Sequence, residues 1–261
     1  MLKKRLIPKL QFSIKPSYRG PKPVLVITRQ FDSKRAIGDP VSQAKIYEAQ
    51  LADELVLVDL EGTSDSWPIL LDTLSIMSES LATPLAVGGG ITSFEQVQQL
   101  LDRGADKVVL NSGAVKNPQL IDRVANSYGS QCVVISIDIR MDSDLTRQVY
   151  IDGGSTATDL SLLSWANDCA SRGAGELLIT SIDNDGTGSG LDLVSIRQLR
   201  HEVNLPLIVS GGCGLAQHFV AGYEGGASAV AAGTFFSQRD QNPMQCRSHI
   251  RNAGLPIRLE Q

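Results

Sequence analysis

The chain has 261 residues, which fits a single closed α/β barrel of about 250 residues. Its 42% hydrophobic content excludes a disordered protein, and its net charge of −4 argues against a general affinity for nucleic acid. No apolar run approaches the roughly 18 residues that span a bilayer, and the basic start MLKKRLIPKLQF lacks the apolar core of a signal peptide. We therefore expect one cytoplasmic domain over residues 1–261.

The four cysteines are far apart, and no CxxC pair occurs. The three histidines do not complete a zinc signature with them. We expect structural thiols in a reducing compartment, no metal ion and no cofactor.

Eight short apolar runs alternate with helix-like stretches along the chain. Near-continuous apolar character is typical of parallel strands covered on both faces. One intervening stretch, residues 93–105, has Ser93 as a plausible N-cap and Gly104 as its stop. The pattern predicts a (β/α)8 barrel with strands within residues 5–10, 54–60, 84–90, 107–112, 133–139, 176–183, 206–212 and 229–235.

An internal repeat divides the chain into two halves. Three pairs of landmarks recur at a constant separation of 122 positions: Glu54 and Glu176, Pro84 and Pro206, and Gly104 and Gly226. A general similarity among βα units would give drifting separations, so the constant one indicates two half-barrels of four βα units each.

Glycine-rich segments follow matching strands of both halves. Residues 88–90 read GGG and are followed by Asn111 and Ser112, whereas residues 210–214 read SGGCG and are followed by Gly233 and Thr234. Glycine lets backbone N–H groups approach an anion, and a following helix N-terminus favours negative charge. For one such segment a tight βα turn is a sufficient explanation. Two symmetric pairs favour a substrate with a phosphate at each end.

With VGGGI, GADKVVLNSGAV, SIDIR, GAGELLITSIDNDGTGSG and LPLIVSGGCG in this order, nearly the whole chain resembles the cyclase subunit of imidazole glycerol phosphate synthase. The resemblance implies a half-barrel-repeat TIM fold, a lyase of histidine biosynthesis, and a heterodimer with a glutaminase that supplies ammonia. It also implies phosphate contacts from Gly90, Asn111 and Ser112 on one side and from Gly186, Gly212, Gly233 and Thr234 on the other.

The catalytic pair of this family is only half present. The family places an aspartate at the ends of strands 1 and 5, as general acid and base. Asp138 matches the second, but Gln11 occupies the first position, and an amide cannot carry a proton near neutral pH. The family's lysine in the following loop aligns with Ile27. We therefore expect cyclisation to be impaired unless another group substitutes.

The segment between Phe12 and Ile37 is longer than the family pattern and strongly basic. It is either a solvated, mobile loop or a lid that attracts an anionic substrate. Its charged residues are Lys15, Arg19, Lys22, Arg29, Lys34 and Arg35, against a single Asp32.

The family's ammonia gate, by contrast, is complete. Its four charges correspond to Arg5, Glu54, Lys107 and Glu176, each directly before or at the start of an apolar run. Two acids and two bases can neutralise one another inside a barrel. Asp106 matches the position where the family meets its glutaminase.

An intact gate with an altered catalytic pair favours a paralogue that resembles those of lipopolysaccharide-sugar amidation, which pass glutaminase-derived ammonia to a different acceptor. Two alternatives stay open: an ordinary histidine-pathway cyclase with a compensated aspartate, and a non-catalytic scaffold that activates a glutaminase. The related phosphoribosyl isomerase needs no ammonia gate and is disfavoured.

Overall fold

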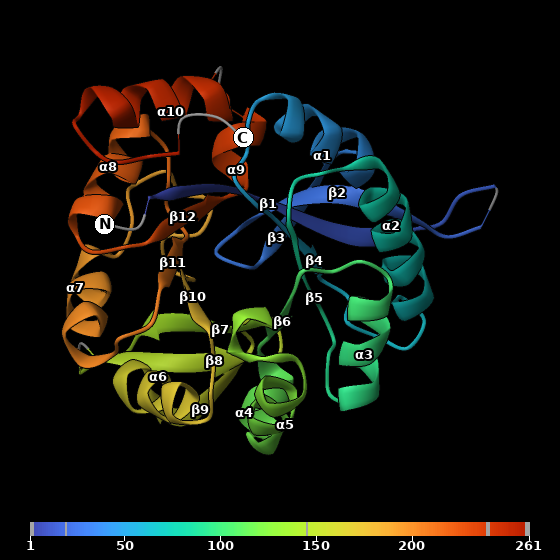
Figure 1. Ribbon diagram of the computed structural model, residues 1–261, viewed down its shortest axis with the longest axis horizontal. Coiled ribbons are helices and arrows are strands. Elements are labelled where there is room, and N and C mark those ends of the chain that lie inside the picture. Colours follow the sequence, from blue (N-terminus) through green and yellow to red (C-terminus); the bar gives the residue numbers. More distant parts are fainter. Residues whose placement is uncertain (1–2, 19, 145, 239–240, 259–261) are drawn as a thin grey trace.

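The computed structural model describes residues 3–18, 20–144, 146–238 and 241–258, and in it eight parallel strands close into a barrel (Figure 1). The barrel closes because β1 pairs with β12 on one side and β4 on the other, while β7 pairs with β10. The predicted (β/α)8 barrel is confirmed. Its strands, in order around the barrel, are β1 (Arg5–Lys15), β4 (Leu55–Asp59), β5 (Leu85–Gly88), β6 (Lys107–Leu110), β7 (Val133–Met141), β10 (Glu176–Ser181), β11 (Leu207–Ser210) and β12 (Ala229–Ala232).

Helices surround the barrel and connect its strands (Figure 1). In α3 the Ser93 hydroxyl accepts from the Gln96 backbone N–H and the Gln96 side chain returns to the Ser93 N–H, a capping box. Gly104 follows the helix with φ of +96°. The helical segments are α1 (Pro40–Ala49), α2 (Trp67–Ser80), α3 (Phe94–Asp102), α4 (Ser112–Lys116), α5 (Gln119–Tyr128), the 3-10 turn η1 (Ser130–Cys132), α6 (Leu162–Ser171), α7 (Leu193–Glu202), α8 (Ala216–Glu224), α9 (Thr234–Gln238) and α10 (Pro243–Asn252).

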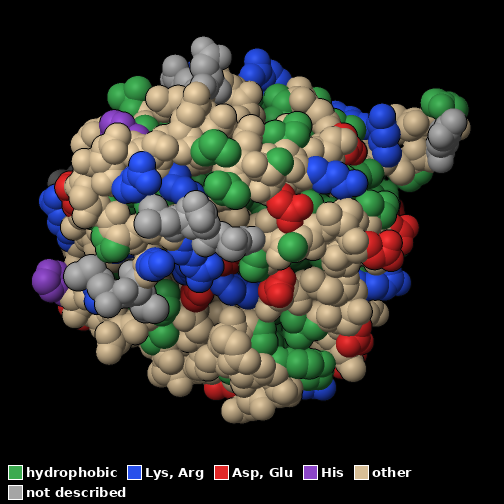
Figure 2. Space-filling model, turned by 45° about the horizontal axis from the view of Figure 1, so that its top comes forward, with side chains coloured by type: hydrophobic (Ala, Val, Ile, Leu, Met, Phe, Trp, Pro, Cys, Tyr) green, Lys and Arg blue, Asp and Glu red, His purple; other side chains and the backbone are tan. Residues whose placement is uncertain are grey.

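Two antiparallel ribbons extend the sheet beyond the barrel. β1 continues into a ribbon with β2 (Lys22–Arg29) and β3 (Ser33–Gly38), and β7 into one with β8 (Arg147–Ile151) and β9 (Thr156–Ser161). The segment between Phe12 and Ile37, interpreted as either a solvated, mobile loop or a lid, therefore forms strands over most of its described residues. The consecutive apolar residues Leu25, Val26 and Ile27 are all buried, and their burial offsets the conformational entropy lost when the ribbon is ordered. The tip of the first ribbon projects from the barrel (Figures 1 and 2).

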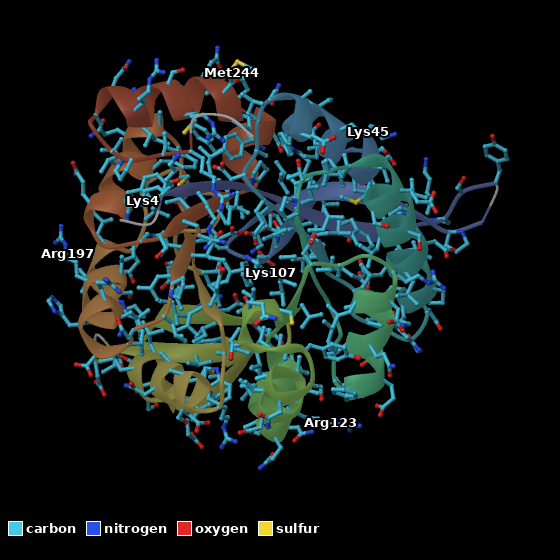
Figure 3. All side chains as sticks on the ribbon, viewed as in Figure 1. Lys4, Lys45, Lys107, Arg123, Arg197 and Met244 are labelled. Carbon is cyan, nitrogen blue, oxygen red and sulfur yellow. The ribbon has the colours of Figure 1, made fainter. Side chains whose placement is uncertain are left out.

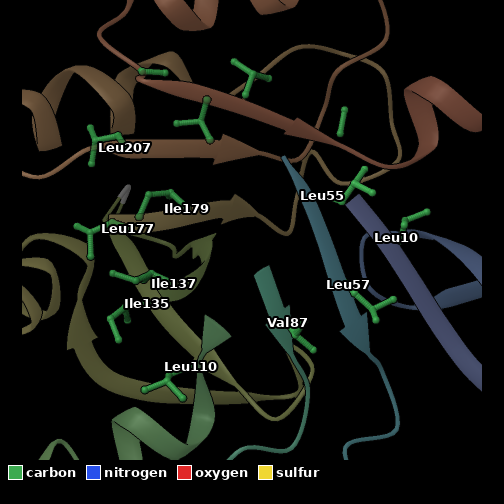
Figure 4. Close-up of a cluster of buried hydrophobic side chains, with 14 of the residues drawn as sticks. Leu10, Leu55, Leu57, Val87, Leu110, Ile135, Ile137, Leu177, Ile179 and Leu207 are labelled. Carbon is green, nitrogen blue, oxygen red and sulfur yellow. The ribbon is translucent and has the colours of Figure 1, made fainter. Parts of the chain in front are cut away.

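The core has two layers, separated by the barrel wall. Outward-facing residues such as Leu10, Leu57 and Ile137 pack against the helices (Figure 4). An inner aliphatic layer fills the barrel and consists of Ile7, Val56, Ala86, Val109, Val134, Leu178, Ile208, Ala229 and Ala231. None of the helices in the described ranges is long and apolar enough to cross a membrane.

Strand register shows which residues of the two halves are equivalent. Gln11 lies opposite Val58 on β4, and Asp138 lies opposite Thr180 on β10. Val58 and Thr180 are 122 positions apart, the separation of the sequence repeat. Gln11 is thus the structural counterpart of Asp138. By the same register, Lys9 is the counterpart of Ser136, because their neighbours Val56 and Leu178 are also 122 positions apart.

Candidate active site and ammonia gate

Alternate residues of β1 point into the barrel, since side chains of a strand alternate between its two faces. Arg5 lies at the N-terminal end, Ile7 belongs to the inner aliphatic layer, and Lys9 and Gln11 line the cavities at the C-terminal end. One strand therefore presents in succession a predicted gate residue, a residue of the inner aliphatic layer and two polar groups of the candidate site.

The four predicted gate residues form a closed ring. Arg5 donates to Glu54 at 2.7 Å and to Glu176 at 2.8 Å, and Lys107 donates to the same two carboxylates at 2.8 and 3.0 Å. Figure 3 labels Lys107 near the centre of the barrel. The ring contains two cations and two anions, so its charges balance.

In this ring, burial and the neighbouring charges have opposite effects on the pKa of Glu176. Burial by itself raises the pKa of Glu176, but the charges of Arg5 and Lys107 outweigh it and hold that pKa below its ordinary value. Glu176 accepts three hydrogen bonds from the two cations, whereas Glu54 accepts two and its Oε1 has no partner among the described residues. The two cations thus favour the charged form of Glu176, and the ring leaves one buried acceptor, Oε1 of Glu54, without a partner among the described residues.

Asp106, the predicted partner-docking residue, is exposed beside this ring. Its Oδ2 accepts a hydrogen bond from the Leu85 backbone N–H at 2.8 Å. Asp106 therefore also caps the start of β5.

The first predicted phosphate site borders a cavity of about 640 Å³ at the C-terminal mouth. Gly90, Asn111 and Ser112 all line it. Gly90 has φ of +67°, and a Cβ there would lie 2.5 Å from the carbonyl oxygen of Gly62. Only glycine fits such a position, so the backbone conformation of this wall depends on it.

The second predicted phosphate site borders a much smaller cavity, of about 20 Å³, enough for a single water. The four predicted residues, Gly186, Gly212, Gly233 and Thr234, all line it. A Cβ on Gly186 would lie 2.2 Å from the carbonyl oxygen of Thr28 in the first ribbon. The structure thus brings each predicted set together, but the second site is nearly filled.

Asp138 lies at the first cavity with its side chain buried. Burial raises its pKa to about 6, although Lys9 and a hydrogen bond from Asn111 Nδ2, at 2.8 Å, oppose that shift. A carboxyl group with a pKa near 6 can exchange a proton close to neutral pH. Asn111 thus contacts Asp138 and is also one of the residues of the first predicted phosphate site.

Gln11 points into the pocket, 6% exposed, and lines both cavities. Two further charged residues that line these cavities were not predicted from the sequence. Lys9 lines both of them and Asp185 lines the smaller one. Burial raises the pKa of Asp185, while a 2.6 Å hydrogen bond from Thr28 and the charge of Lys9 oppose the shift. Period-two alternation along β1 would have placed Lys9 inside the barrel.

The first ribbon covers part of the mouth. Besides the Thr28 hydrogen bond to Asp185, the Gln30 backbone N–H donates to the Asp185 carbonyl oxygen at 2.8 Å. Ile27, at the family's lysine position, is buried. Of the basic residues, Lys34 lines the larger cavity and Arg19 lies outside the described residues, whereas the others are exposed on the ribbon: Lys15, Lys22, Arg29 and Arg35. On the face drawn in Figure 2, basic and acidic side chains are interspersed.

The strand order and the matching register of its two halves define a (β/α)8 barrel protein with a half-barrel repeat. The family model "Histidine biosynthesis protein" matches residues 20–241. Over its full length the chain is 94% identical to the whole of a Prochlorococcus marinus protein provisionally named imidazole glycerol phosphate synthase subunit hisF2. It is 42% identical over 260 residues, 99% of this chain and 100% of the relative, to imidazole glycerol phosphate synthase subunit HisF of Flavobacterium johnsoniae. It is 39% identical over 258 residues, 99% and 97%, to the subunit HisF of Gluconacetobacter diazotrophicus. The chain belongs to the histidine biosynthesis protein family, as a HisF-like subunit of the synthase type.

Proposed function

We propose that this chain receives ammonia from a glutaminase through its N-terminal gate and delivers it to an acceptor with a phosphate at each end. In this proposal it is a paralogue of the histidine-pathway cyclase that serves amidation of a surface-polysaccharide sugar. The observation that carries the proposal is the combination of a complete gate ring with Gln11 in place of one catalytic carboxyl group.

The gate supports ammonia passage by its charge balance. A single buried charge in the barrel would be strongly destabilising, whereas a neutral network of ion pairs is tolerated. Above the ring, the inner aliphatic layer excludes water from the path to the mouth. The free Oε1 of Glu54 is a hydrogen-bond acceptor for an ammonia molecule at the ring.

The mouth supports a substrate that differs from the family's usual one. Proton transfer by one group is typically worth about 10²–10⁴-fold in rate. Asp138 can carry a proton but Gln11 cannot. An acceptor that needs only one such group fits this pair better than ring closure by two.

An ordinary histidine-pathway cyclase is the second candidate, and the 39–42% identity to HisF subunits over nearly the whole chain favours it. In that case another group replaces the missing carboxyl group. The relatives' names identify them as synthase subunits, which also supports a glutaminase partner for this chain.

The test begins with co-purification of the full chain with a HisH-type glutaminase from the same genome. We expect a stable complex in which this chain raises the rate of glutamine hydrolysis. Asp106→Asn should weaken the complex, because it removes a charge at the proposed docking face and still leaves an acceptor oxygen for the Leu85 N–H. Asp102→Asn, an exposed change nearby at the end of α3, is the matched control.

Glutamine-dependent transfer is followed next, in the complex with Lys107→Met. This variant should hydrolyse glutamine while losing ammonia to solvent, so that free ammonium accumulates. A chain that forms no complex and does not stimulate the glutaminase would contradict the proposal. Stimulation with no effect of Lys107→Met on ammonium release would support the scaffold alternative instead.

A further inference from the structure

Lys9 occupies the centre of the candidate site. Among the described residues, only Lys9 and Gln11 line both the larger and the smaller cavity. If a substrate is anchored by a phosphate at each end, its middle segment would therefore lie beside Lys9. Neither the proposed phosphate contacts nor the gate makes use of this residue.

The ammonium group of Lys9 is not held by the protein. It makes no hydrogen bond or ion pair within 4 Å to any residue that the structure describes, although Lys9 is only partly exposed. Its three N–H donors are therefore available to a bound molecule. A merely structural lysine at this depth would be expected to pair with a carboxylate directly.

Two buried carboxyl groups nevertheless lie near it. The charge of Lys9 counters the effect of burial on both Asp138 and Asp185. These two groups come from the second half of the barrel, whereas Lys9 comes from the first. The pocket is thus polarised, with a cation on the β1 side and acids on the β7 and β10 sides.

We propose that Lys9 is the specificity-determining residue of the site and binds a carbonyl or anionic oxygen in the middle of the acceptor. An ammonium donor forms charge-assisted hydrogen bonds with such an oxygen. The equivalent position in the other half is Ser136, so the second half supplies no corresponding cation. This inference rests on the proposed two-phosphate acceptor.

The experiment measures binding by calorimetry to the full chain, with two probes. One is inorganic phosphate, and the other is the phosphoribulosyl bisphosphate used by histidine-pathway cyclases. Lys9→Met should weaken binding of the bisphosphate by about tenfold to a hundredfold, the range for loss of a hydrogen bond to a charged group. Lys9→Arg, which keeps the charge, should recover most of that loss.

Lys34→Met is the matched control, because Lys34 lines only the larger cavity and is exposed. It should change bisphosphate binding much less than Lys9→Met. Binding of inorganic phosphate should be nearly the same in the wild type and in both Lys9 variants, since Lys9 is assigned to the middle segment. A wild type that binds no bisphosphate, or a Lys9→Met variant that binds it as well as the wild type does, would overturn the inference.

A carbon-13 NMR titration of Asp138 checks the geometry independently of any ligand. In Lys9→Met the pKa of Asp138 should rise above its value of about 6, because a neighbouring positive charge is lost. An unchanged titration would show that Lys9 does not face Asp138 and would also overturn the inference. Neither measurement uses a glutaminase, so failure here is distinct from failure to form the complex.

Discussion

The two half-barrels share their backbone features and differ in their reactive side chains. Gly90 and Gly212 occupy equivalent positions, and both have a positive φ against a neighbouring backbone segment. Glu54 and Glu176 occupy equivalent positions in the gate ring. Toward the C-terminal end of the first barrel strand of each half, however, the first half has Gln11 where the second half has Asp138. The two halves thus share backbone conformation and the charges of the ring, and they differ in the side chain at the position of Gln11 and Asp138.

The cavities beside the two predicted phosphate sites also differ, in their volume. The cavity beside the first phosphate site has about 640 Å³ and that beside the second only about 20 Å³. The first ribbon is near both cavities: its Thr28 lines the larger one, and Thr28 and Gln30 also bond to Asp185, which lines the smaller one. The second ribbon instead places Asp152 and Gly153 on the wall of the larger cavity. Both ribbons therefore border the larger cavity, and the first also contacts a residue that lines the smaller one.

The largest expected effect concerns the gate, where both halves must cooperate. Lys107→Met removes one cation from between Glu54 and Glu176 and should lower the free energy of unfolding by about 3–5 kcal/mol, as for other buried ion pairs broken on one side. Urea denaturation measures this. Asp72→Asn, in an exposed ion pair with Arg103, should cost less than about 1 kcal/mol. Equal small losses in both variants would mean that the ring is not buried.

The next effect is the pH dependence of the free energy of unfolding, which Asp138 should cause and its counterpart Gln11 should not. The pKa of Asp138 is raised to about 6 from its ordinary 3.8, so the folded state binds more protons than the unfolded state between these values. Asp138 therefore does not lower the free energy of unfolding below about pH 4, where it is protonated in both states. It lowers that free energy progressively as pH rises through 6, where the folded state must ionise a buried carboxyl group. Asp138→Asn should therefore be more stable than the wild type at pH 7, by at most about 3 kcal/mol, and this advantage should vanish near pH 4.

Gln11→Asp supplies the matched case for that titration, because it places a new carboxyl group at the equivalent position of the first half. Its stability relative to the wild type should fall as pH rises. If neither variant shows a pH-dependent difference in the free energy of unfolding, then these two positions are not desolvated as described.

A smaller effect compares glycines at the two phosphate sites. Gly90→Ala forces a positive φ and a 2.5 Å contact with the Gly62 carbonyl oxygen, so it should cost about 1–3 kcal/mol and weaken phosphate binding. Gly233→Ala should cost less, since its Cβ would lie 3.1 Å from the Lys9 carbonyl oxygen and no positive φ is required. Thermal unfolding and calorimetry with inorganic phosphate measure both. The reverse order would contradict the assignment of Gly90 to a strained wall.

Much of the barrel could be predicted from the sequence, because its signals are local. Each buried parallel strand begins in a short apolar run; six of the eight strands lie wholly within their runs, and β1 and β7 extend beyond theirs into the ribbons. The constant separation of 122 positions also placed Glu54 and Glu176 at one level of the barrel, where the ring is observed. Ser93 and Gly104 bound their helix as expected.

The features that could not be predicted from the sequence depend on contacts between segments that are far apart in the chain. The ribbons at β2–β3 and β8–β9 were not predicted, because their outer strands β3 and β9 are mostly exposed and carry little periodic signal. Lys9 was missed because a lysine within an apolar run is usually interpreted as a surface residue. The contact of Thr28 with Asp185, which lines the smaller cavity, joins residues 157 positions apart, and no local pattern reveals it.

The central claim, that the two halves retain one scaffold but no longer form a complete acid–base pair, is tested most directly by ammonium-dependent turnover of the histidine-pathway bisphosphate. The purified wild type should show little or no turnover, and Gln11→Asp should raise it, by up to about 10²–10⁴-fold if proton transfer at this position limits the rate. Adding Asp138→Asn to Gln11→Asp should abolish the gain. Turnover by the wild type at the rate of an ordinary cyclase would contradict the account.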